Sequence, residues 1–292
     1  MVRILKRNII FFLDIISINI MKSSLNKLSG STYARWILLF FIAFTDIWAV
    51  KNPGLSFIIF LAPLIFVLLH SFKLFGKKHT FIIFGIIILI SFISEYLGVH
   101  TGRVFGPYYY NPSSKVNGFL WGGVPPLVTF SYISMGYCSY VLSRIIFGKL
   151  GKLSGTAIAG VPIVAAMIMT MWDMSFDPIA SYVNKIYTWY EGGAYFGVPF
   201  RNFTGWFLET LVFFVIIGIY FSLFAKAKDY LIKPSKLFLA EVIFLVAANA
   251  FGTISHEFHN PTMIQQAMAI VALFGLGMPV VIAGFRLLES NK

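Results

Sequence analysis

Long apolar runs are the feature of this sequence that most limits its possible folds. Eight of them could cross the hydrocarbon of a bilayer, which takes about 20 residues of helix. The runs cover residues 34–50, 55–72, 80–98, 118–142, 155–171, 203–225, 236–254 and 264–286. Charged residues make up only 12% of the chain, against about 25% in soluble domains, and the mean hydropathy is +0.82. We therefore expect an all-α fold, a polytopic membrane bundle of about eight transmembrane helices.

Short connections join these runs, so residues 34–292 are predicted to form a single transmembrane bundle. The preceding residues, 1–33, form a basic N-terminal segment whose apolar stretch is interrupted by Asp14. No small-residue cleavage site follows that stretch, as a signal peptide would require. Two interpretations fit this segment: an amphipathic surface helix, or a start assigned upstream of the true one at Met21.

The basic residues are distributed unevenly between the two sides of this bundle. With a cytoplasmic N-terminus, the cytoplasmic segments hold 18 of the 23 lysines and arginines, and the outer segments hold five. The positive-inside rule therefore predicts a multi-pass protein of the cell (inner) membrane with both termini in the cytoplasm. The net charge of +12 is then explained by orientation and by attraction to anionic membrane lipid. Nucleic acid is not expected as a partner.

The sequence contains no motif that indicates a cofactor or a metal ion. Its one cysteine, Cys138, excludes an internal disulfide and a cysteine cluster. His256 and His259 stand three residues apart, whereas the histidines of the HExxH zinc motif stand four apart. A glycine-rich nucleotide motif is missing too, so we expect neither a cofactor nor a metal.

Polar residues that could do chemistry gather in one stretch, residues 172–206, between two apolar runs. It combines Asp173, Asp177 and Glu191 with many aromatic rings, and we expect it at the membrane interface on the outer side. Such a composition is also typical of a plain aromatic belt. Asp173 and Asp177 stand four residues apart, which places both carboxyl groups on one face of a helix. When two carboxyl groups lie so near each other, the state in which one of them keeps its proton is favoured.

Two alternatives apply to this aspartate pair. Asp177 directly precedes Pro178 and could instead cap a helix. The DxxxD spacing also occurs in membrane prenyltransferases, but those enzymes carry a second aspartate-rich motif that this sequence lacks.

A further carboxyl group, Glu95, lies at the end of the third apolar run. An ionisable residue inside a membrane span is costly and is usually paired or functional. The structural alternative is an ion pair between Glu95 and Arg103 that fixes the following loop. Glu209 also falls near the outer end of its run.

Several sequence blocks occur together in an order that is specific. They are EYLGVHTGRVFGPYYY (95–110), GGVP (122–125), Trp172-Asp173, Asp177-Pro178, Trp189, GAYFGVP (193–199) and NFTGW (202–206). Over about residues 80–285 the chain resembles a membrane family of carotenoid biosynthesis. That family includes CruF-type carotenoid 1,2-hydratases and archaeal bisanhydrobacterioruberin hydratase.

The resemblance implies a cofactor-independent hydro-lyase. Such an enzyme adds water across the terminal 1,2 double bond of an acyclic carotenoid end group and produces a tertiary alcohol. Lycopene, γ-carotene or a bacterioruberin precursor would be the substrate. The chemistry needs a carboxylic acid to protonate the alkene, ring faces to stabilise the cation and a carboxylate to orient the attacking water.

The candidate residues follow from these three needs. The acid is Asp173 or Asp177, and the base is Glu191 or Glu95. Residues expected to bind the substrate are Trp172, Trp189, Tyr195, Arg103, Asn202 and Trp206, of which Trp172, Trp189 and Tyr195 form the wall around the cation.

Two other functions remain open. A carotenoid cyclase-like enzyme would share the protonation step and end without water. An isoprenoid-binding or transport protein would have internal repeats or broken helices, and the sequence shows no convincing repeat. Hydration alone adds the mass of one water to the pigment.

Overall fold

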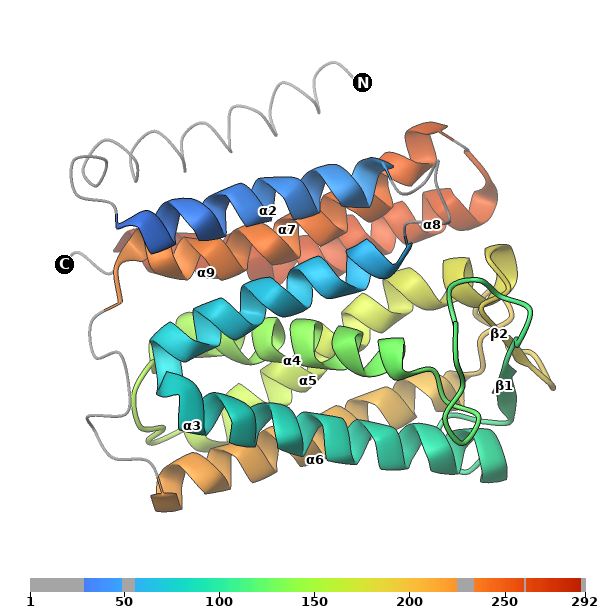
Figure 1. Ribbon diagram of the computed structural model, residues 1–292, viewed down its shortest axis with the longest axis horizontal. Helices are drawn as coiled ribbons and strands as arrows, with labels where there is room; N and C mark the ends of the chain where they lie inside the picture. Colours follow the sequence, from blue (N-terminus) through green and yellow to red (C-terminus); the bar gives the residue numbers. More distant parts are fainter. Residues whose placement is uncertain (1–28, 49–55, 225–233, 260, 290–292) are drawn as a thin grey trace.

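A computed structural model describes residues 29–48, 56–224, 234–259 and 261–289 (Figure 1). Its α-helices are α2 (Gly30–Trp48), α3 (Ser56–Thr101), α4 (Pro126–Ile146), α5 (Ala157–Pro178), α6 (Phe200–Phe224), α7 (Lys236–His259), α8 (Met263–Val271) and α9 (Gly277–Glu289). Two π-helical turns, η4 (Ile179–Val183) and η6 (Ala272–Leu276), and two strands, β1 (Tyr108–Tyr110) and β2 (Tyr187–Trp189), complete the elements. The all-α helix bundle expected from the sequence is confirmed. Of the basic N-terminal segment 1–33, only Ser29 to Tyr33 fall within the described residues.

Helix α3 covers two of the expected membrane runs because it bends sharply at Gly76. The backbone of Gly76 has φ 76° and ψ 161°, a conformation that glycine adopts easily and other residues avoid. The two arms on either side of the bend run in opposite directions (Figure 1). They correspond to the apolar runs at 55–72 and 80–98.

The helices are those of a membrane protein. Within the described residues, five helical segments are long and apolar enough to cross a bilayer: Phe57–Thr101, Ala157–Val183, Phe200–Phe224, Lys236–Ser255 and Met263–Glu289. The apolar part of α2 is shorter, at Gly30–Thr45. Helix α4 does not belong to this set, and its packing explains why.

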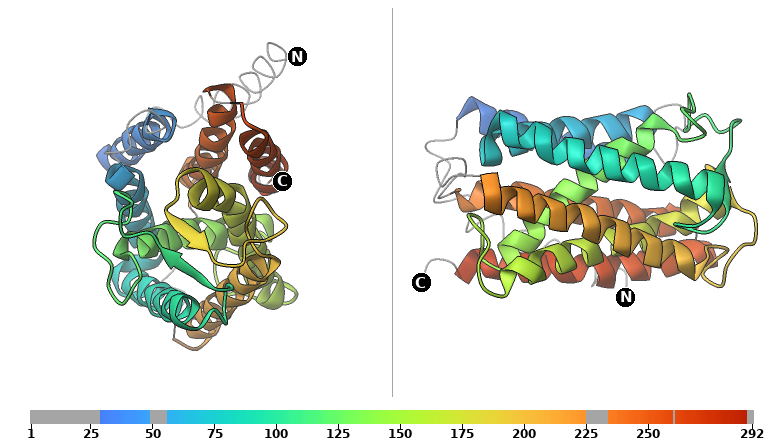
Figure 2. Two further views of the ribbon diagram at one scale, coloured as in Figure 1. Left: turned by 90° about the vertical axis from the view of Figure 1, so that its right-hand side faces the viewer. Right: turned by 90° about the horizontal axis from the view of Figure 1, so that it is seen from below.

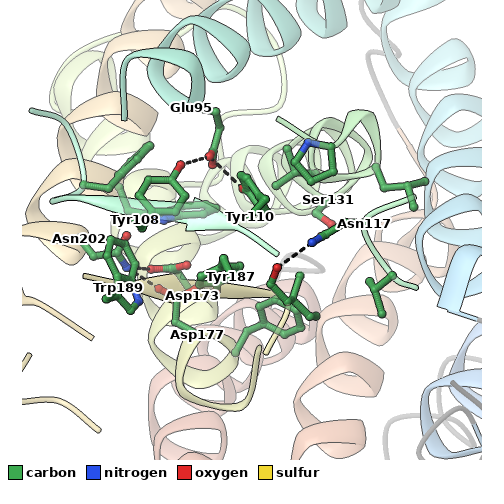
Figure 3. A pocket seen from close by; sticks show the side chains of 18 of the residues that line it. Glu95, Tyr108, Tyr110, Asn117, Ser131, Asp173, Asp177, Tyr187, Trp189 and Asn202 are labelled. Carbon is green, nitrogen blue, oxygen red and sulfur yellow. Dashed lines mark hydrogen bonds between the residues drawn. The ribbon is translucent and has the colours of Figure 1, made fainter. Parts of the chain in front are cut away.

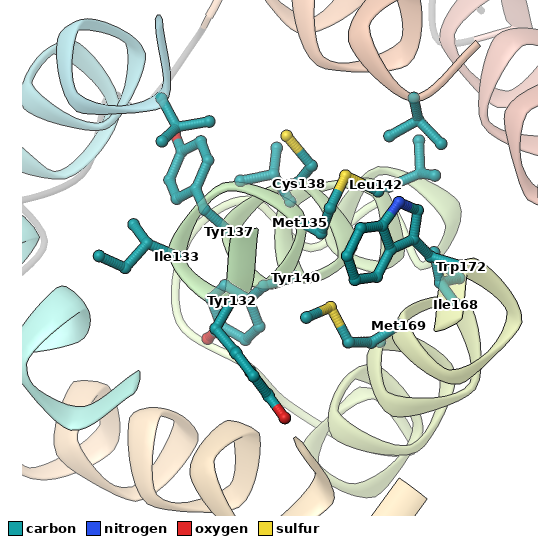
Figure 4. Close-up of a cluster of buried hydrophobic side chains, with 14 of the residues drawn as sticks. Tyr132, Ile133, Met135, Tyr137, Cys138, Tyr140, Leu142, Ile168, Met169 and Trp172 are labelled. Atoms are coloured by element: carbon teal, nitrogen blue, oxygen red, sulfur yellow. The ribbon is translucent and has the colours of Figure 1, made fainter. Parts of the chain in front are cut away.

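Helix α4 is surrounded by the other helices (Figure 2). It packs against α3, α5, α7 and α9, and 16 of its residues are buried. Its side chains point into the protein on several sides, as Figure 4 shows for Tyr132, Tyr137 and Tyr140. Since little of α4 faces lipid, it can carry hydroxyl groups that a lipid-facing helix avoids. The expected run 118–142 is correct only in its second part, because the helix begins at Pro126, a residue suited to a first helical turn.

The chain repeats one arrangement of elements. The second arm of α3 is followed by β1, a turn and α4, and α5 is followed by β2, a turn and α6. Each turn is closed by an isolated bridge, Trp121 to Val124 in the first and Tyr195 to Val198 in the second. The two strands pair antiparallel, with Tyr109 opposite Thr188. This repeat was not found in the sequence, and it brings the ends of two helices to one pair of strands.

Candidate active site

The two short strands close one end of the bundle with aromatic side chains. Successive side chains of a strand point to opposite faces, so β1 and β2 each turn two rings towards the helices. Tyr108, Tyr110, Tyr187 and Trp189 are buried, whereas Tyr109 is 37% exposed. The buried rings lie between Glu95 on one side and Asp173 with Asp177 on the other (Figure 3).

Glu95, in the last turns of α3, is surrounded by phenol groups. Its side chain is buried, and its Oε2 accepts hydrogen bonds from the hydroxyls of Tyr108 and, at 2.9 Å, Tyr110. Its Oε1 accepts a third from the Tyr132 hydroxyl at 2.9 Å. Burial raises the pKa of Tyr108 and of Tyr110 well above the usual range, and the nearby Glu95 carboxylate adds to the shift. Both hydroxyls therefore remain protonated donors.

The alternative reading of Glu95, an ion pair with Arg103, is wrong. Arg103 is exposed, and its carbonyl oxygen accepts a hydrogen bond from the Arg201 guanidinium at 2.7 Å. These two arginines tie the loop after α3 to the start of α6. They lie outside the group of carboxylates.

Asp173 and Asp177 share one partner, as residues on one helical face can. The Asn202 side-chain amide donates to Asp173 Oδ2 at 2.8 Å and to Asp177 Oδ2 at 2.5 Å. The Tyr187 hydroxyl donates to Asp177 Oδ1, and burial with the nearby Asp177 raises the Tyr187 pKa well above its usual range. The Asp177 carboxylate thus faces side chains and does not cap a helix. Helix α5 ends at Pro178 as expected, but η4 continues the helical path to Val183.

Among the described side chains, no cation forms an ion pair with these carboxyl groups. Between described side chains the one ion pair joins Arg35 to Glu241, at 2.6 Å. Asp173 Oδ1 is buried and has no hydrogen-bond partner. A buried carboxylate that lacks both a cation and a full set of donors is costly. The Asp173–Asp177 pair is therefore built to hold at least one proton.

A cavity connects the two acidic groups. Its empty space is about 670 Å³, a volume that includes open solvent at its mouth. Glu95 borders it on one side and Asp173 with Asp177 on the other (Figure 3). Its apolar lining includes Phe60, Val116, Leu127, Val128 and Phe176.

Large rings form much of the remaining wall. Trp172 stacks on Phe176 at 5.3 Å and meets Trp206 edge-on at 6.0 Å, measured between ring centroids. On the strands, Trp189 lies 4.9 Å from Tyr108. These ring faces can stabilise a positive charge that develops in the cavity.

Most of the residues expected from the sequence come together here. Those that line the cavity are Glu95, Asp173, Asp177, Trp172, Trp189, Asn202 and Trp206. Glu191 and Arg103 are exposed and lie outside its lining. Tyr195 does not line the cavity either. Its half-buried hydroxyl donates to the Met174 carbonyl at 3.1 Å, and burial raises its pKa to about 12.

Several side chains of the site are absent from the sequence-based candidates, including Tyr108 and Tyr110. Tyr187 could have been found from its alternation with Trp189 along a short strand. Tyr132 gave no signal, because nothing in an apolar run marks which hydroxyl faces a carboxylate. Asn117 fixes the loop after β1 through hydrogen bonds to the carbonyls of Asn111 and Ile186, at 2.8 and 2.7 Å.

Among the described residues no group of three His, Cys, Asp or Glu side chains is placed to hold a metal ion. The side chains of His256 and His259 lie outside the described part of the chain.

Comparisons with known proteins give one result. Neither the curated proteins nor the solved structures contain a match. The family model described as carotenoid biosynthesis protein matches residues 54–278, which is well over half of the chain and contains every residue of the cavity. The chain therefore belongs to the carotenoid biosynthesis protein family.

Proposed function

We propose that this membrane protein hydrates the terminal 1,2 double bond of an acyclic carotenoid end group and produces a tertiary alcohol. Membership of the family supports a biosynthetic role with a carotenoid-related substrate. The observation that carries the finer proposal is the placement of Asp173 and Asp177 across a ring-lined cavity from Glu95.

The aspartate pair supplies the proton in the first step. The carboxylic acid of Asp173 or Asp177 protonates C2 of the alkene, and the π electrons form the new C–H bond. This leaves a tertiary cation at C1 and a second carboxylate in the pair. The amide of Asn202 and the hydroxyl of Tyr187 then stabilise the negative charge through hydrogen bonds.

Ring faces hold the cation until water attacks. Trp172 and Trp206 lie on one wall and Trp189 on the strands, so the charge can lie against an indole face. A dry, aromatic wall also prevents early capture by bulk water.

Glu95 acts as the base. Its three phenol donors favour the carboxylate, which accepts a proton from the attacking water while the oxygen bonds to C1. The proton gained by Glu95 returns to the aspartate pair through water before the next cycle, so the sum is one water added. The exposed Glu191, the other expected base, takes no part.

The membrane places the substrate. The apolar lining at Phe60, Leu127 and Val128 suits an isoprenoid chain whose remainder lies in the bilayer. We place the protein in the cell (inner) membrane with cytoplasmic termini, and its substrate is lycopene, γ-carotene or a bacterioruberin precursor.

Expression in a lycopene- or γ-carotene-producing host, followed by mass analysis of the pigment, tests the proposal. We expect a product heavier by one water per acyclic end, and none from an Asp177→Asn variant that is present in the membrane. A new pigment of unchanged mass would establish cyclisation instead and overturn hydration.

An isoprenoid-binding or transport protein is the second candidate, and one observation favours it. Such proteins are often built from internal repeats, and the α3–β1–α4 and α5–β2–α6 units repeat one arrangement. If every acyclic carotenoid offered stays chemically unchanged while it co-purifies with the protein, this candidate replaces the hydratase.

A further inference from the structure

Glu209 is a buried acid of α6 that the proposed reaction does not use. Its side chain is 5% exposed, and it does not line the cavity. Its Oε2 lies 3.2 Å from the Tyr132 hydroxyl oxygen, which also lies 2.9 Å from Glu95 Oε1. Tyr132 on α4 thus stands between two carboxyl groups, one in the cavity and one behind it.

The phenol has one proton and cannot donate it to both carboxyl groups. If both were ionised, one carboxylate would face only the lone pairs of the phenol oxygen. The contacts are all satisfied when one carboxyl group is protonated and donates to Tyr132, which in turn donates to the other. The geometry therefore requires a proton on either Glu95 or Glu209.

The surroundings of the two acids decide between them. Glu95 has two further phenol donors, Tyr108 and Tyr110, which suit a carboxylate. Glu209 has one further neutral donor, Ser94 of α3, and its Oε1 is buried without a described partner at hydrogen-bond distance. Arg35 and Glu241 form the one ion pair between described side chains, so no described cation pairs with Glu209. The neutral form suits Glu209, because a buried charge with few donors and no described cation beside it is costly.

We propose that Glu209 is a positioning residue of the site: as a neutral carboxylic acid it donates to Tyr132 and commits the single Tyr132 proton to Glu95. The Trp206 ring, one turn before Glu209 on α6, stacks on Tyr132 at 4.5 Å with an interplanar angle of 4°. The phenol is thus held from two directions, and Glu95 stays ionised. The effect on catalysis rests on the proposed function, whereas the protonation of Glu209 does not.

Infrared spectroscopy of the purified protein tests the protonation without any substrate. In the difference between wild type and Glu209→Gln at neutral pH, we expect the loss of a carboxylic acid C=O band. Loss of a carboxylate band instead would show that Glu209 is ionised and would overturn the proposal, whatever reaction the protein catalyses.

The pH–rate profile of pigment hydration tests the positioning. The titratable groups that face Glu209 are Tyr132 from α4 and, beyond it, Glu95 from α3. A glutamine at 209 can still donate to Tyr132, so we expect Glu209→Gln to keep the profile. Tyr132→Phe removes a donor from Glu95, and the acid limb should move to higher pH by about one unit, since a hydrogen bond to a charged group changes its protonation about tenfold.

Glu209→Leu should move the acid limb in the same direction by less, and the Glu209→Leu/Tyr132→Phe double variant should match Tyr132→Phe alone. This coincidence is expected because Glu209 acts only through Tyr132. A purely structural role would lower the amount of folded protein and leave the profile in place. Additive shifts, or an altered profile in Glu209→Gln, would overturn the proposal.

Discussion

At the scale of single residues, the acids of this site have no cationic partner among the described side chains. Glu95 is balanced by phenol donors, and the aspartate pair by one amide, one phenol and its own proton. Tyrosines whose pKa is raised by burial remain neutral donors, so they can stabilise a carboxylate without joining its titration. Neutral partners leave the acids free to exchange protons with a substrate, which a guanidinium partner would oppose.

Asp173→Asn and Asp177→Asn test the acid. Asparagine keeps the shape but cannot give a carboxylic proton, and a lost general acid costs about 10²- to 10⁴-fold in rate. We expect both variants to insert in the membrane and to convert little pigment, measured as product per mole of folded protein. Near wild-type hydration by both variants would place the acid elsewhere.

Glu95→Gln and Glu191→Gln form a matched pair for the base. The amide at position 95 cannot accept a proton from water and places N–H donors against phenol donors, so we expect hydration to fall by at least about 10²-fold. Glu191 is exposed and outside the cavity, so its variant should keep wild-type activity. The opposite ranking would restore Glu191 as the base.

Glu241, on α7 and outside the lining of the cavity, does not offer a neutral control as Glu241→Gln. Arg35 binds the Glu241 carboxylate through its Nε at 2.6 Å and its Nη2 at 3.0 Å. Removing one partner of a buried pair costs about 3–5 kcal/mol. Any loss of activity in this variant would therefore report unfolding.

The reaction should need no metal ion. The sequence has no nucleotide motif, its histidine spacing is wrong for zinc, and in the proposed mechanism a carboxylic acid supplies the proton. Pigment hydration should therefore persist after treatment with a chelator. Loss of hydration that one specific metal restores would mean that the aspartates, or His256 and His259, bind a metal.

At the scale of elements, the apolar runs predicted where helices lie and missed how they end. The predicted run 118–142 begins in the loop before α4. Gly118 to Val124 are as apolar as a membrane span, so hydropathy cannot distinguish this loop from the helix that follows it. The strands β1 and β2 are three residues each, too short for a period of two to stand out. Their pairing joins residues about 80 positions apart in the sequence, and no local pattern encodes it.

The candidate site was also only partly predictable, because local sequence patterns show contacts within one element and not contacts between elements. Residues on one element, such as Asp173 and Asp177, could be placed together from helical spacing alone. Glu191 and Tyr195 lie in the same stretch of sequence, yet the chain between β2 and α6 turns them out of the cavity. Tyr132 and Glu209 reach the site from other helices, so only tertiary packing reveals them.

Close packing between α6 and the loop before β1 holds the strands in place. A Cβ added at Gly205 would lie 2.5 Å from the Val104 carbonyl oxygen, which is backbone and cannot easily move. Gly205→Ala should therefore lower the free energy of unfolding by about 1–3 kcal/mol and displace Tyr108 and Tyr110. The unfolding midpoint in detergent and the hydration rate should both fall.

Gly218→Ala on the same helix is the matched control. An added Cβ there meets nothing within 4 Å, and alanine favours helix over glycine by up to about 1 kcal/mol. This variant should unfold at the same or a higher temperature with unchanged activity. Equal damage from both variants would mean that α6 tolerates no substitution and that the contact with Val104 is not special.

At the scale of the whole molecule, the candidate site and the basic connection between α4 and α5 lie at opposite ends of the described bundle. The strands and the acidic groups lie at one end of the bundle, and the connection between α4 and α5, with Lys149 and Lys152, lies at the other (Figure 1). A basic end is expected on the cytoplasmic side. In the proposed orientation the cavity lies towards the outer face.

A reporter fused at two positions tests this orientation. Inserted after Lys152, a reporter active only in the cytoplasm should be active, because the basic connection stays inside. Inserted after Gly192, between β2 and α6, the same reporter should be silent, and one active only outside should be active. The 18-to-5 distribution of basic residues supports this result, and so does the opposite placement of the two connections in the bundle. An external signal after Lys152 would reverse the bundle, and the aspartates and Glu95 would then draw their protons from the cytoplasm.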